Sequence, residues 1–232
     1  MREDTYVLMT MRTPTSIVFV VDDDEHVRNA FCRLLRSSDY TVQAFESASA
    51  FLEHADLASA PACLLLDLQL PELNGIELQR RLNGVVPIVL ISAHGDMNTA
   101  VEAMKAGASD FLAKPIDADV LFSATVRALE QAGHLFEQRE WHAEVEHRVG
   151  TLTPREREVM ALVVKGWPNK LVADELGAAE KTIKIHRARV MTKMKVRSLA
   201  ELVRLCATAG FYAPDLPSLP SGHMQPSGPH KD

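Results

Sequence analysis

Short apolar runs alternate with amphipathic stretches through the first half of the chain. The apolar runs cover residues 17–21, 41–45, 62–67, 88–91 and 110–113. Their aliphatic composition is typical of strands buried on both faces of a parallel sheet. Stretches with helical periodicity separate them, which indicates right-handed crossovers. We therefore predict an α/β fold for residues 16–131, a flavodoxin-like doubly wound sheet in which five strands take the order 2-1-3-4-5.

Beyond residue 131 the pattern becomes helical throughout. Residues 132–150 lack proline and repeat Trp141, Val145 and Val149 at intervals of four. This pattern predicts a helical linker that prolongs the last helix of the first domain. A solvated spacer and a dimerising coiled coil both fit this segment, and the absence of sustained heptads favours the spacer.

Residues 151–211 predict a second domain, which is all-α. Thr153 is an N-cap, Pro154 takes the first helical position and Glu156 completes a capping box. Further helices are expected at about 169–176, 180–194 and 198–209. The two ends differ from both domains: residues 1–15 read as a disordered leader, and the proline-rich residues 212–232 as a disordered tail without assigned function.

Charge divides the chain in the same place. Residues 1–150 hold 12 Lys and Arg against 23 Asp and Glu, a net charge of −11, whereas residues 151–206 hold 12 against 6, a net charge of +6. An acidic first domain and a basic second domain suggest different partners, and that of the second is expected to be anionic. No apolar stretch is long enough to span a bilayer. Three widely spaced cysteines suggest reduced, buried thiols and a cytoplasmic location.

Polar residues follow four of the predicted strands. Asp22 and Asp23 follow the first, Asp67 ends the third, Ser92 follows the fourth and Lys114 follows the fifth. Each alone has an ordinary explanation as a cap or turn residue. Because the carboxyl ends of parallel strands meet at one edge of a sheet, their joint occurrence predicts a common site.

The predicted site has the composition of a phosphoryl-transfer centre. Neighbouring carboxylates repel one another unless a cation lies between them, and an all-oxygen set suits Mg²⁺. One carboxylate can then act as nucleophile toward phosphorus. Lys114 can neutralise charge on the transferring group, and the Ser92 hydroxyl can donate a hydrogen bond to it.

The segment from Asp67 to Gly75, Asp-Leu-Gln-Leu-Pro-Glu-Leu-Asn-Gly, resembles the phosphoacceptor segment of two-component response-regulator receivers. Together with Asp22, Asp23, Ser92 and Lys114, the resemblance covers residues 16–131. It implies that Asp67 accepts a phosphoryl group from a sensor histidine kinase.

The same resemblance implies roles for the surrounding residues. Asp23 and Asp67 would bind Mg²⁺ directly, Asp22 through water and Gln69 through its main-chain carbonyl. Ser92 and Phe111 would be switch residues that respond to phosphorylation, although Phe111 could equally be a plain core aromatic. The Lys114–Pro115 peptide would be cis.

Residues 169–194 read as two helices joined by a turn at Gly177, the second helix being basic. This arrangement suggests a helix-turn-helix whose second helix enters the major groove of DNA. A cationic helix face can also be merely solvated, but the net positive charge of this domain in an acidic chain favours DNA.

The second domain resembles the LuxR-type helix-turn-helix effectors, through residues 152–159, 166–170, 182–186 and 200–203. The likeness implies a four-helix domain that dimerises through its last helix. One departure is the pair Ala178 and Ala179, which stand where the family usually has an aliphatic residue and a Ser or Thr cap. Capping of the recognition helix should therefore be weaker by about 1 kcal/mol, unless Glu180 compensates. The expected DNA-contacting residues are Lys181, Thr182, Lys184, Ile185, Arg187, Ala188 and Arg189.

Both resemblances together indicate the NarL/FixJ class of response regulators. Such a protein would be a phosphorylation-activated, DNA-binding transcriptional regulator that forms a homodimer on phosphorylation and binds double-stranded promoter DNA. RNA polymerase is left open as a further partner. The only reactions that the regulator itself would catalyse are its own phosphorylation and dephosphorylation.

Two alternatives stay open from the residues alone. One is a Mg²⁺-dependent phosphatase with an Asp nucleophile, which would want a second Asp where Gln69 stands. The other is a constitutive DNA-binding protein that uses its receiver as a dimerisation scaffold.

Overall fold

The computed structural model describes residues 16–71, 73–93 and 97–210. The chain divides into two compact units between Arg139 and Glu140. The predicted leader (1–15) and tail (212–232) lie outside the described residues. Each unit is considered by itself.

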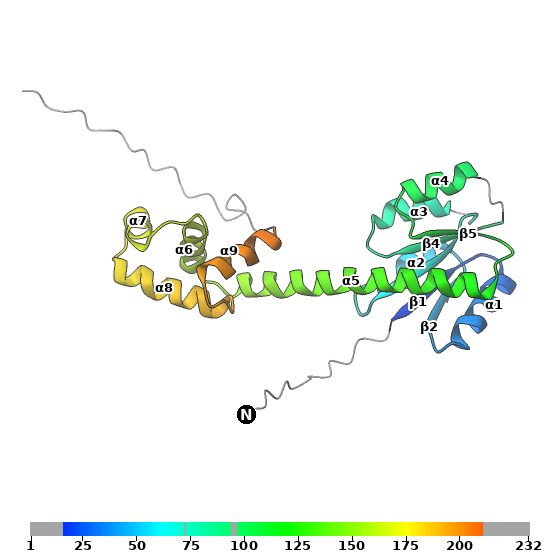
Figure 1. The fold of residues 1–232 in the computed structure, drawn as a ribbon, viewed down its shortest axis with the longest axis horizontal. Coiled ribbons are helices and arrows are strands. Elements are labelled where there is room, and N and C mark those ends of the chain that lie inside the picture. Colours follow the sequence, from blue (N-terminus) through cyan, green and yellow to red (C-terminus); the bar gives the residue numbers. More distant parts are fainter. Residues whose placement is uncertain (1–15, 72, 94–96, 211–232) are drawn as a thin grey trace, which may run out of the picture. The chain divides into compact units, whose positions relative to one another are not determined.

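The first unit is built on a five-stranded parallel sheet (Figure 1). Its strands are β1 (Ile17–Val21), β2 (Thr41–Phe45), β3 (Ala62–Asp67), β4 (Ile88–Ser92) and β5 (Asp110–Ala113). They lie in the order β2-β1-β3-β4-β5, which confirms the predicted flavodoxin-like topology.

Helices cover both faces of this sheet. They are α1 (Glu25–Arg36), α2 (Ala48–His54), α3 (Gly75–Leu82), α4 (Met97–Lys105) and α5 (Ala118–Gly150). Helices α1 and α5 lie on one face and α2, α3 and α4 on the other (Figure 1). Alternate residues of β1 therefore enter different cores: Phe19 packs on the α2–α4 side, and Val18 and Val20 on the α1–α5 side. Burial on both faces explains why β1, β3 and β4 are almost continuously apolar. The edge strands β2 and β5 are only partly buried, so the expectation of burial on both faces is wrong for these two strands.

Side-chain caps fix where several of these helices begin. The Asp24 carboxylate accepts hydrogen bonds from the backbone N–H of His26 at 2.8 Å and of Val27 at 3.2 Å. These bonds lower the pKa of Asp24 below its usual value. Asn74 caps α3 in the same way through the N–H of Ile76.

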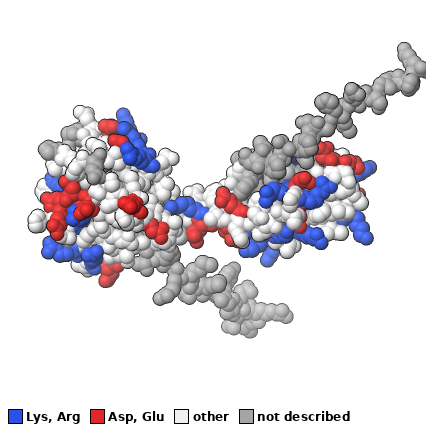
Figure 2. Space-filling model, turned by 180° about the vertical axis from the view of Figure 1, so that it is seen from behind, with Lys and Arg blue, Asp and Glu red and all other residues white. Residues whose placement is uncertain are grey.

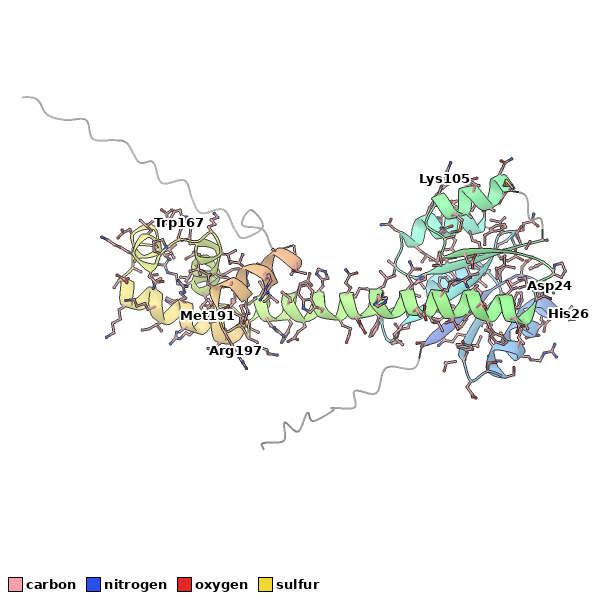
Figure 3. All side chains as sticks on the ribbon, in the orientation of Figure 1. Asp24, His26, Lys105, Trp167, Met191 and Arg197 are labelled. Carbon is pink, nitrogen blue, oxygen red and sulfur yellow. The ribbon has the colours of Figure 1, made fainter. Side chains whose placement is uncertain are left out.

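The second unit contains α6 (Pro154–Val164), α7 (Asn169–Glu175), α8 (Glu180–Lys193) and α9 (Leu199–Thr208). These helices enclose one apolar core. The partly buried side chains of Trp167 and Met191 pack against it (Figure 3). The capping box predicted at the start of α6 is present. Gly177, with φ of 59°, makes the left-handed turn before α8, a conformation that favours glycine.

Helix α5 runs without interruption to Gly150, so the predicted helical linker exists. The prediction that this linker is a solvated spacer is wrong for the last turns of α5, however. Val145 and Val149 are 1% and 9% exposed and belong to the core of the second unit. An Nη of Arg148 also donates to the main-chain oxygen of Met194 at 3.2 Å. Residues 141–149 are therefore part of the helical unit.

All three cysteines are free and buried, as predicted. Within the described ranges, the chain has no helix whose length and hydropathy would let it cross a membrane.

Candidate functional site

Strand pairing brings the predicted site residues to one edge of the sheet. In the β1–β3 register Val21 lies opposite Leu66, so Asp22 and Asp67 follow at neighbouring positions. The registers of β3 with β4 and of β4 with β5 continue the row. The residues that meet there are Asp22, Asp23, Asp67, Ser92 and Lys114.

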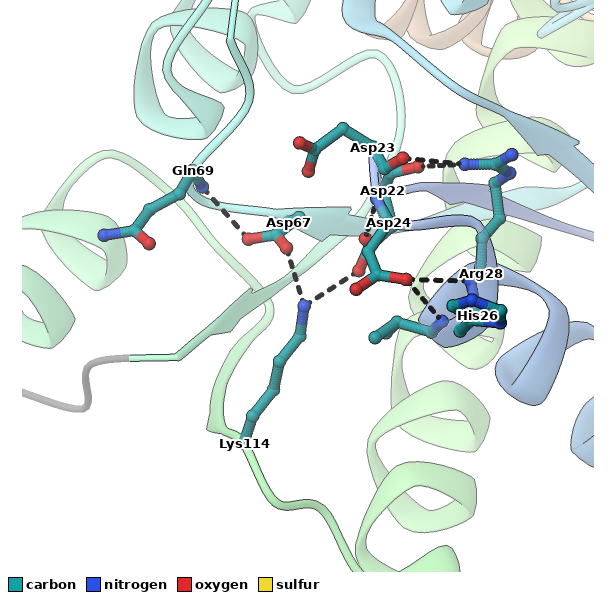
Figure 4. A network of polar contacts seen from close by, with 9 residues as sticks. Asp22, Asp23, Asp24, His26, Arg28, Asp67, Gln69 and Lys114 are labelled. Carbon is teal, nitrogen blue, oxygen red and sulfur yellow. Dashed lines mark hydrogen bonds and ion pairs between the residues drawn. The ribbon is translucent and has the colours of Figure 1, made fainter.

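Lys114 joins two of the carboxylates (Figure 4). Its Nζ lies 2.9 Å from Oδ2 of Asp22 and 2.6 Å from Oδ2 of Asp67. The two carboxylates are almost fully buried, with side chains 2% and 9% exposed, whereas that of Lys114 is 21% exposed. Charge-assisted hydrogen bonds of this kind are stronger than neutral ones, so Lys114 holds both carboxylates in place.

The environment shifts the pKa values of this pair. Burial raises the pKa of Asp22, although the hydrogen bond and charge of Lys114 act in the opposite direction. Burial by itself would lower the pKa of Lys114, but the hydrogen bonds to Asp67 and Asp22 and the negative charges of these carboxylates together raise that pKa. Lys114 is therefore a permanent cation at neutral pH.

The carboxylates fit a divalent metal ion. One oxygen from each of Asp22, Asp23 and Asp67 can be chosen so that all three lie within 4.8 Å of one another. Their donors are hard oxygens, which Mg²⁺ prefers, and one lysine leaves the cluster with excess negative charge. Gln69 adjoins this cluster, because its backbone N–H donates to Oδ1 of Asp67 at 3.0 Å.

Two supporting residues were not singled out from the sequence. An Nη of Arg28 donates to the main-chain oxygens of Asp22, at 2.7 Å, and Asp23, at 3.3 Å (Figure 4). Nothing in the local pattern marks this arginine. Gly75 begins α3 so close to the site that a Cβ there would lie 2.8 Å from the main-chain oxygen of Asp67. Its place in the motif after Asp67 was the available signal.

The predicted switch residues lie on the two strands beyond Asp67. Ser92 is fully buried, and its carbonyl accepts from the N–H of Lys114 at 2.8 Å. Phe111 is half-buried and packs against the core on the α2–α4 side. The Lys114–Pro115 peptide is cis, as predicted. Phosphorylation is also expected to shift the loop of residues 93–95, and residues 94 and 95 of that loop lie outside the described residues.

Helix α8 carries the predicted DNA-contacting residues. Six of the seven are exposed, and Arg187 is half-buried. The apolar positions Ile183 and Val190 of the same helix are buried, so α8 presents its polar side to solvent. The space-filling view shows basic side chains over the helical unit and many acidic ones over the first unit (Figure 2).

Comparison with known families matches both units. Residues 18–126 match the family of response regulator receiver domains. Residues 150–206 match the family of bacterial regulatory proteins of the luxR type. Among solved structures, that of the response regulator StyR is similar over 83% of this chain and 98% of StyR, with a TM-score of 0.71 and 44% identity.

Curated relatives match across both units. Nodulation protein W of Bradyrhizobium diazoefficiens is 44% identical over 207 residues, which are 88% of this chain and 91% of that protein. The transcriptional regulatory protein FixJ of Azorhizobium caulinodans is 39% identical, over 85% of this chain and 95% of its own length. The response regulator TodT of Pseudomonas putida is also 39% identical, over 85% and 88%.

Proposed function

The chain belongs to the response regulators of the NarL/FixJ class, and from that premise we propose that its Asp67 accepts a phosphoryl group from a sensor histidine kinase. Members of this class are phosphorylation-activated transcriptional regulators, not enzymes acting on other substrates. One observation carries the assignment to Asp67. Its buried carboxylate lies 2.6 Å from Lys114 at the edge where Asp22 and Asp23 converge.

The proposed transfer is a displacement at phosphorus. A carboxylate oxygen of Asp67 forms the new O–P bond while the P–N bond of the phosphohistidine breaks, and the released imidazole nitrogen keeps the electron pair. Lys114 offsets the charge of the phosphoryl oxygens, and the hydroxyl of Ser92 donates to one of them. Asp22, Asp23, Asp67 and the main-chain carbonyl of Gln69 would hold Mg²⁺, which supplies further positive charge when bound.

Phosphorylation would reach the rest of the receiver through Ser92 and Phe111. Ser92 moves toward the new phosphoryl oxygens, and the half-buried ring of Phe111 turns further inward. We propose that a homodimer results. An apolar stripe on α4 supports this, since Met97, Val101 and Met104 are 81%, 45% and 48% exposed at intervals of four and three residues.

The homodimer would bind double-stranded promoter DNA through α8 in the major groove. Lys184, Ile185, Arg187 and Ala188 would meet base edges, while Lys181, Thr182 and Arg189 would lie along phosphates. Promoter DNA as target implies action in the cytoplasm, where contact with RNA polymerase would complete transcriptional control.

One alternative is a constitutive DNA-binding protein. Such a protein would have no use for the acidic edge of the sheet, the cluster of Asp22, Asp23, Asp67 and Lys114. Lys114 contacts Asp22 and Asp67, and an oxygen of Asp23 lies within 4.8 Å of oxygens of both, which favours phosphorylation. For the phosphatase alternative, Gln69 still occupies the position of the required second acid.

Asp67→Asn should abolish labelling of the full chain by radioactive acetyl phosphate in Mg²⁺, because the amide is no nucleophile. It should also abolish the shift from monomer to dimer that beryllofluoride and Mg²⁺ produce in the wild type during sedimentation. Asp119→Asn, an exposed carboxylate in the first turn of α5, is the matched control and should retain both. Retained labelling of Asp67→Asn would place the acceptor elsewhere, and a wild type that stays monomeric would exclude the proposed dimer.

A further inference from the structure

The cations of α8 and its end differ in what holds them. Nζ of Lys184 lies 3.0 Å from Oε1 of Glu180. Nζ of Lys193 lies 2.6 Å from Oε2 of Glu156. In both cases a carboxylate neutralises the lysine, which lowers its capacity to attract a further anion.

Arg187 is held by a neutral group instead. Its Nη1 donates to Oδ1 of Asn169 at 3.2 Å. Asn169 is the first residue of α7, eighteen positions earlier, so this bond crosses the helix-turn-helix. Both side chains are half-buried. Among the residues that the structure describes, no carboxylate lies within ion-pair distance of Arg187.

A neutral acceptor fixes a guanidinium without cancelling its charge. Arginine has five N–H donors in a rigid fork, and the bond to Asn169 uses one of them. The others remain available with the full positive charge. Because one edge is fixed, less side-chain freedom is lost when the opposite edge binds a ligand.

We propose that Asn169 is a positioning residue that orients Arg187 toward a guanine base in the major groove. The proposal rests on the DNA-binding function proposed above. Guanine is the expected partner because its O6 and N7 form the acceptor pair that matches the guanidinium fork. Asn169 itself need not touch DNA.

The test uses the full chain with beryllofluoride and Mg²⁺, and a pool of duplex oligonucleotides with a randomised central segment. Bound duplexes are sequenced to obtain the base preference at each position. The wild type should select a motif with a guanine that Arg187→Ala no longer requires. Asn169→Ala should reduce the preference for that guanine by about tenfold, the size of one lost bidentate contact, and leave the other positions unchanged.

A conservative variant separates orientation from charge. Asn169→Asp keeps the acceptor, so it should retain the preference for guanine, but it neutralises Arg187 and should weaken binding to all sequences. Lys184→Ala is the matched control, since it removes a cation of α8 without touching the bond between Asn169 and Arg187. It should alter a different position of the motif, because Lys184 is itself proposed to meet a base edge, and leave the preference for the guanine read by Arg187 unchanged.

The outcomes test two claims separately: that Arg187 reads a guanine, and that Asn169 orients Arg187. If Arg187→Ala selects the wild-type motif, Arg187 does not read a base and the assignment of that contact is wrong. If Arg187→Ala loses the guanine and Asn169→Ala retains it, only the positioning role is wrong. A loss of preference at all positions in Asn169→Ala, with an earlier unfolding transition in tryptophan fluorescence, would mean that Asn169 merely stabilises the fold. A wild type that selects no motif would overturn both.

Discussion

The acidic edge of the sheet and the helical unit treat charge in opposite ways. At the edge three carboxylates lie together, and one lysine, Lys114, pairs with the two that are almost fully buried, Asp22 and Asp67. In the helical unit, the buried Glu156 pairs with Lys193, and Glu144 contacts both Lys195 and Arg148. The edge of the sheet leaves negative charge unbalanced, whereas these two carboxylates of the helical unit are each paired with a cation.

This contrast separates binding from structural roles. Buried charge without enough partners destabilises a fold, so it is retained where a ligand completes the set. The acidic edge meets this description, because a cation and a phosphoryl group would together satisfy it. The ion pairs of the helical unit are complete without a ligand. Together with the hydrogen bond from Arg148 to Met194, they join the end of α5 and the start of α6 to the end of α8. Arg187 of α8 resembles the acidic edge in this respect. It is a half-buried charge of the helical unit, and its hydrogen-bond partner, Asn169, is neutral.

Replacing Lys114 with alanine should have the largest effect on stability. It would leave Asp22 and Asp67 buried without their cation, and we expect the receiver to lose about 2 kcal/mol in the absence of Mg²⁺, less than a fully buried pair would cost because Lys114 is partly exposed. Added Mg²⁺ should make this loss of stability smaller. Hydrogen exchange of the strands β1, β3 and β4 in the full chain would measure both effects.

Lys105→Ala removes an exposed lysine from α4 of the same unit and is the matched control. It should change exchange little, and its response to Mg²⁺ should equal that of the wild type. If Lys114→Ala behaved like this control, the carboxylates at the edge would not depend on Lys114, and the contrast between the two regions would fail.

Strand order and the acidic edge could be predicted from the sequence because both depend on local signals. The buried strands β1, β3 and β4 are apolar runs, and Asp22, Asp67 and Ser92 end or directly follow them. The topology of parallel strands then brings them together without further information. Boundaries were predicted less exactly: α9 covers Leu199–Thr208, one residue less at each end than the predicted 198–209.

What could not be predicted depends on contacts between distant residues. The repeat of Trp141, Val145 and Val149 indicated a helix, but not that the last two would enter the core of the second unit. Apolar residues at intervals of four fit a spacer, a coiled coil or a packed helix equally well. The bonds from Arg28 and Asn169 likewise join side chains to partners that no spacing rule connects.

Glu156→Gln would test the balanced side of the comparison. Oε2 of Glu156 accepts from Nζ of Lys193 at 2.6 Å and from the N–H of Thr153 at 2.9 Å. These bonds, that of Lys193 first, lower the pKa of Glu156 to about 2 from its usual 4.5. The variant should destabilise the helical unit by about 1.5 kcal/mol at neutral pH. Both tryptophans of the chain, Trp141 and Trp167, lie in this unit, so their fluorescence during urea unfolding measures the change.

The pH dependence of that difference follows from the lowered pKa. A carboxylate whose pKa is lower in the folded chain stabilises fully above its unfolded pKa, here 4.5, and loses its contribution as the pH falls toward 2. The gap between wild type and Glu156→Gln should therefore close over this window. Glu144→Gln is the control: its pKa is also lowered to about 2, by Lys195 and then Arg148, but its side chain is 42% exposed. Solvent should make its effect smaller, and an equal effect would contradict the role of burial.

The smallest expected effect concerns the start of α8. Ala179 is its N-cap, with extended backbone (φ −70°, ψ 142°) and no side-chain cap. Glu180 does not substitute for a cap, because its carboxylate pairs with Lys184. Ala179→Ser would supply an oxygen for a free N–H of the first turn and should stabilise the helical unit by about 1 kcal/mol, measured by the same fluorescence. Ala207→Ser, an exposed position inside α9, should instead destabilise it slightly because serine is a weaker helix former. Since neither change alters a charge, the two should differ in sign at every pH, and a shared sign would show that serine acts at Ala179 through something other than the helix end.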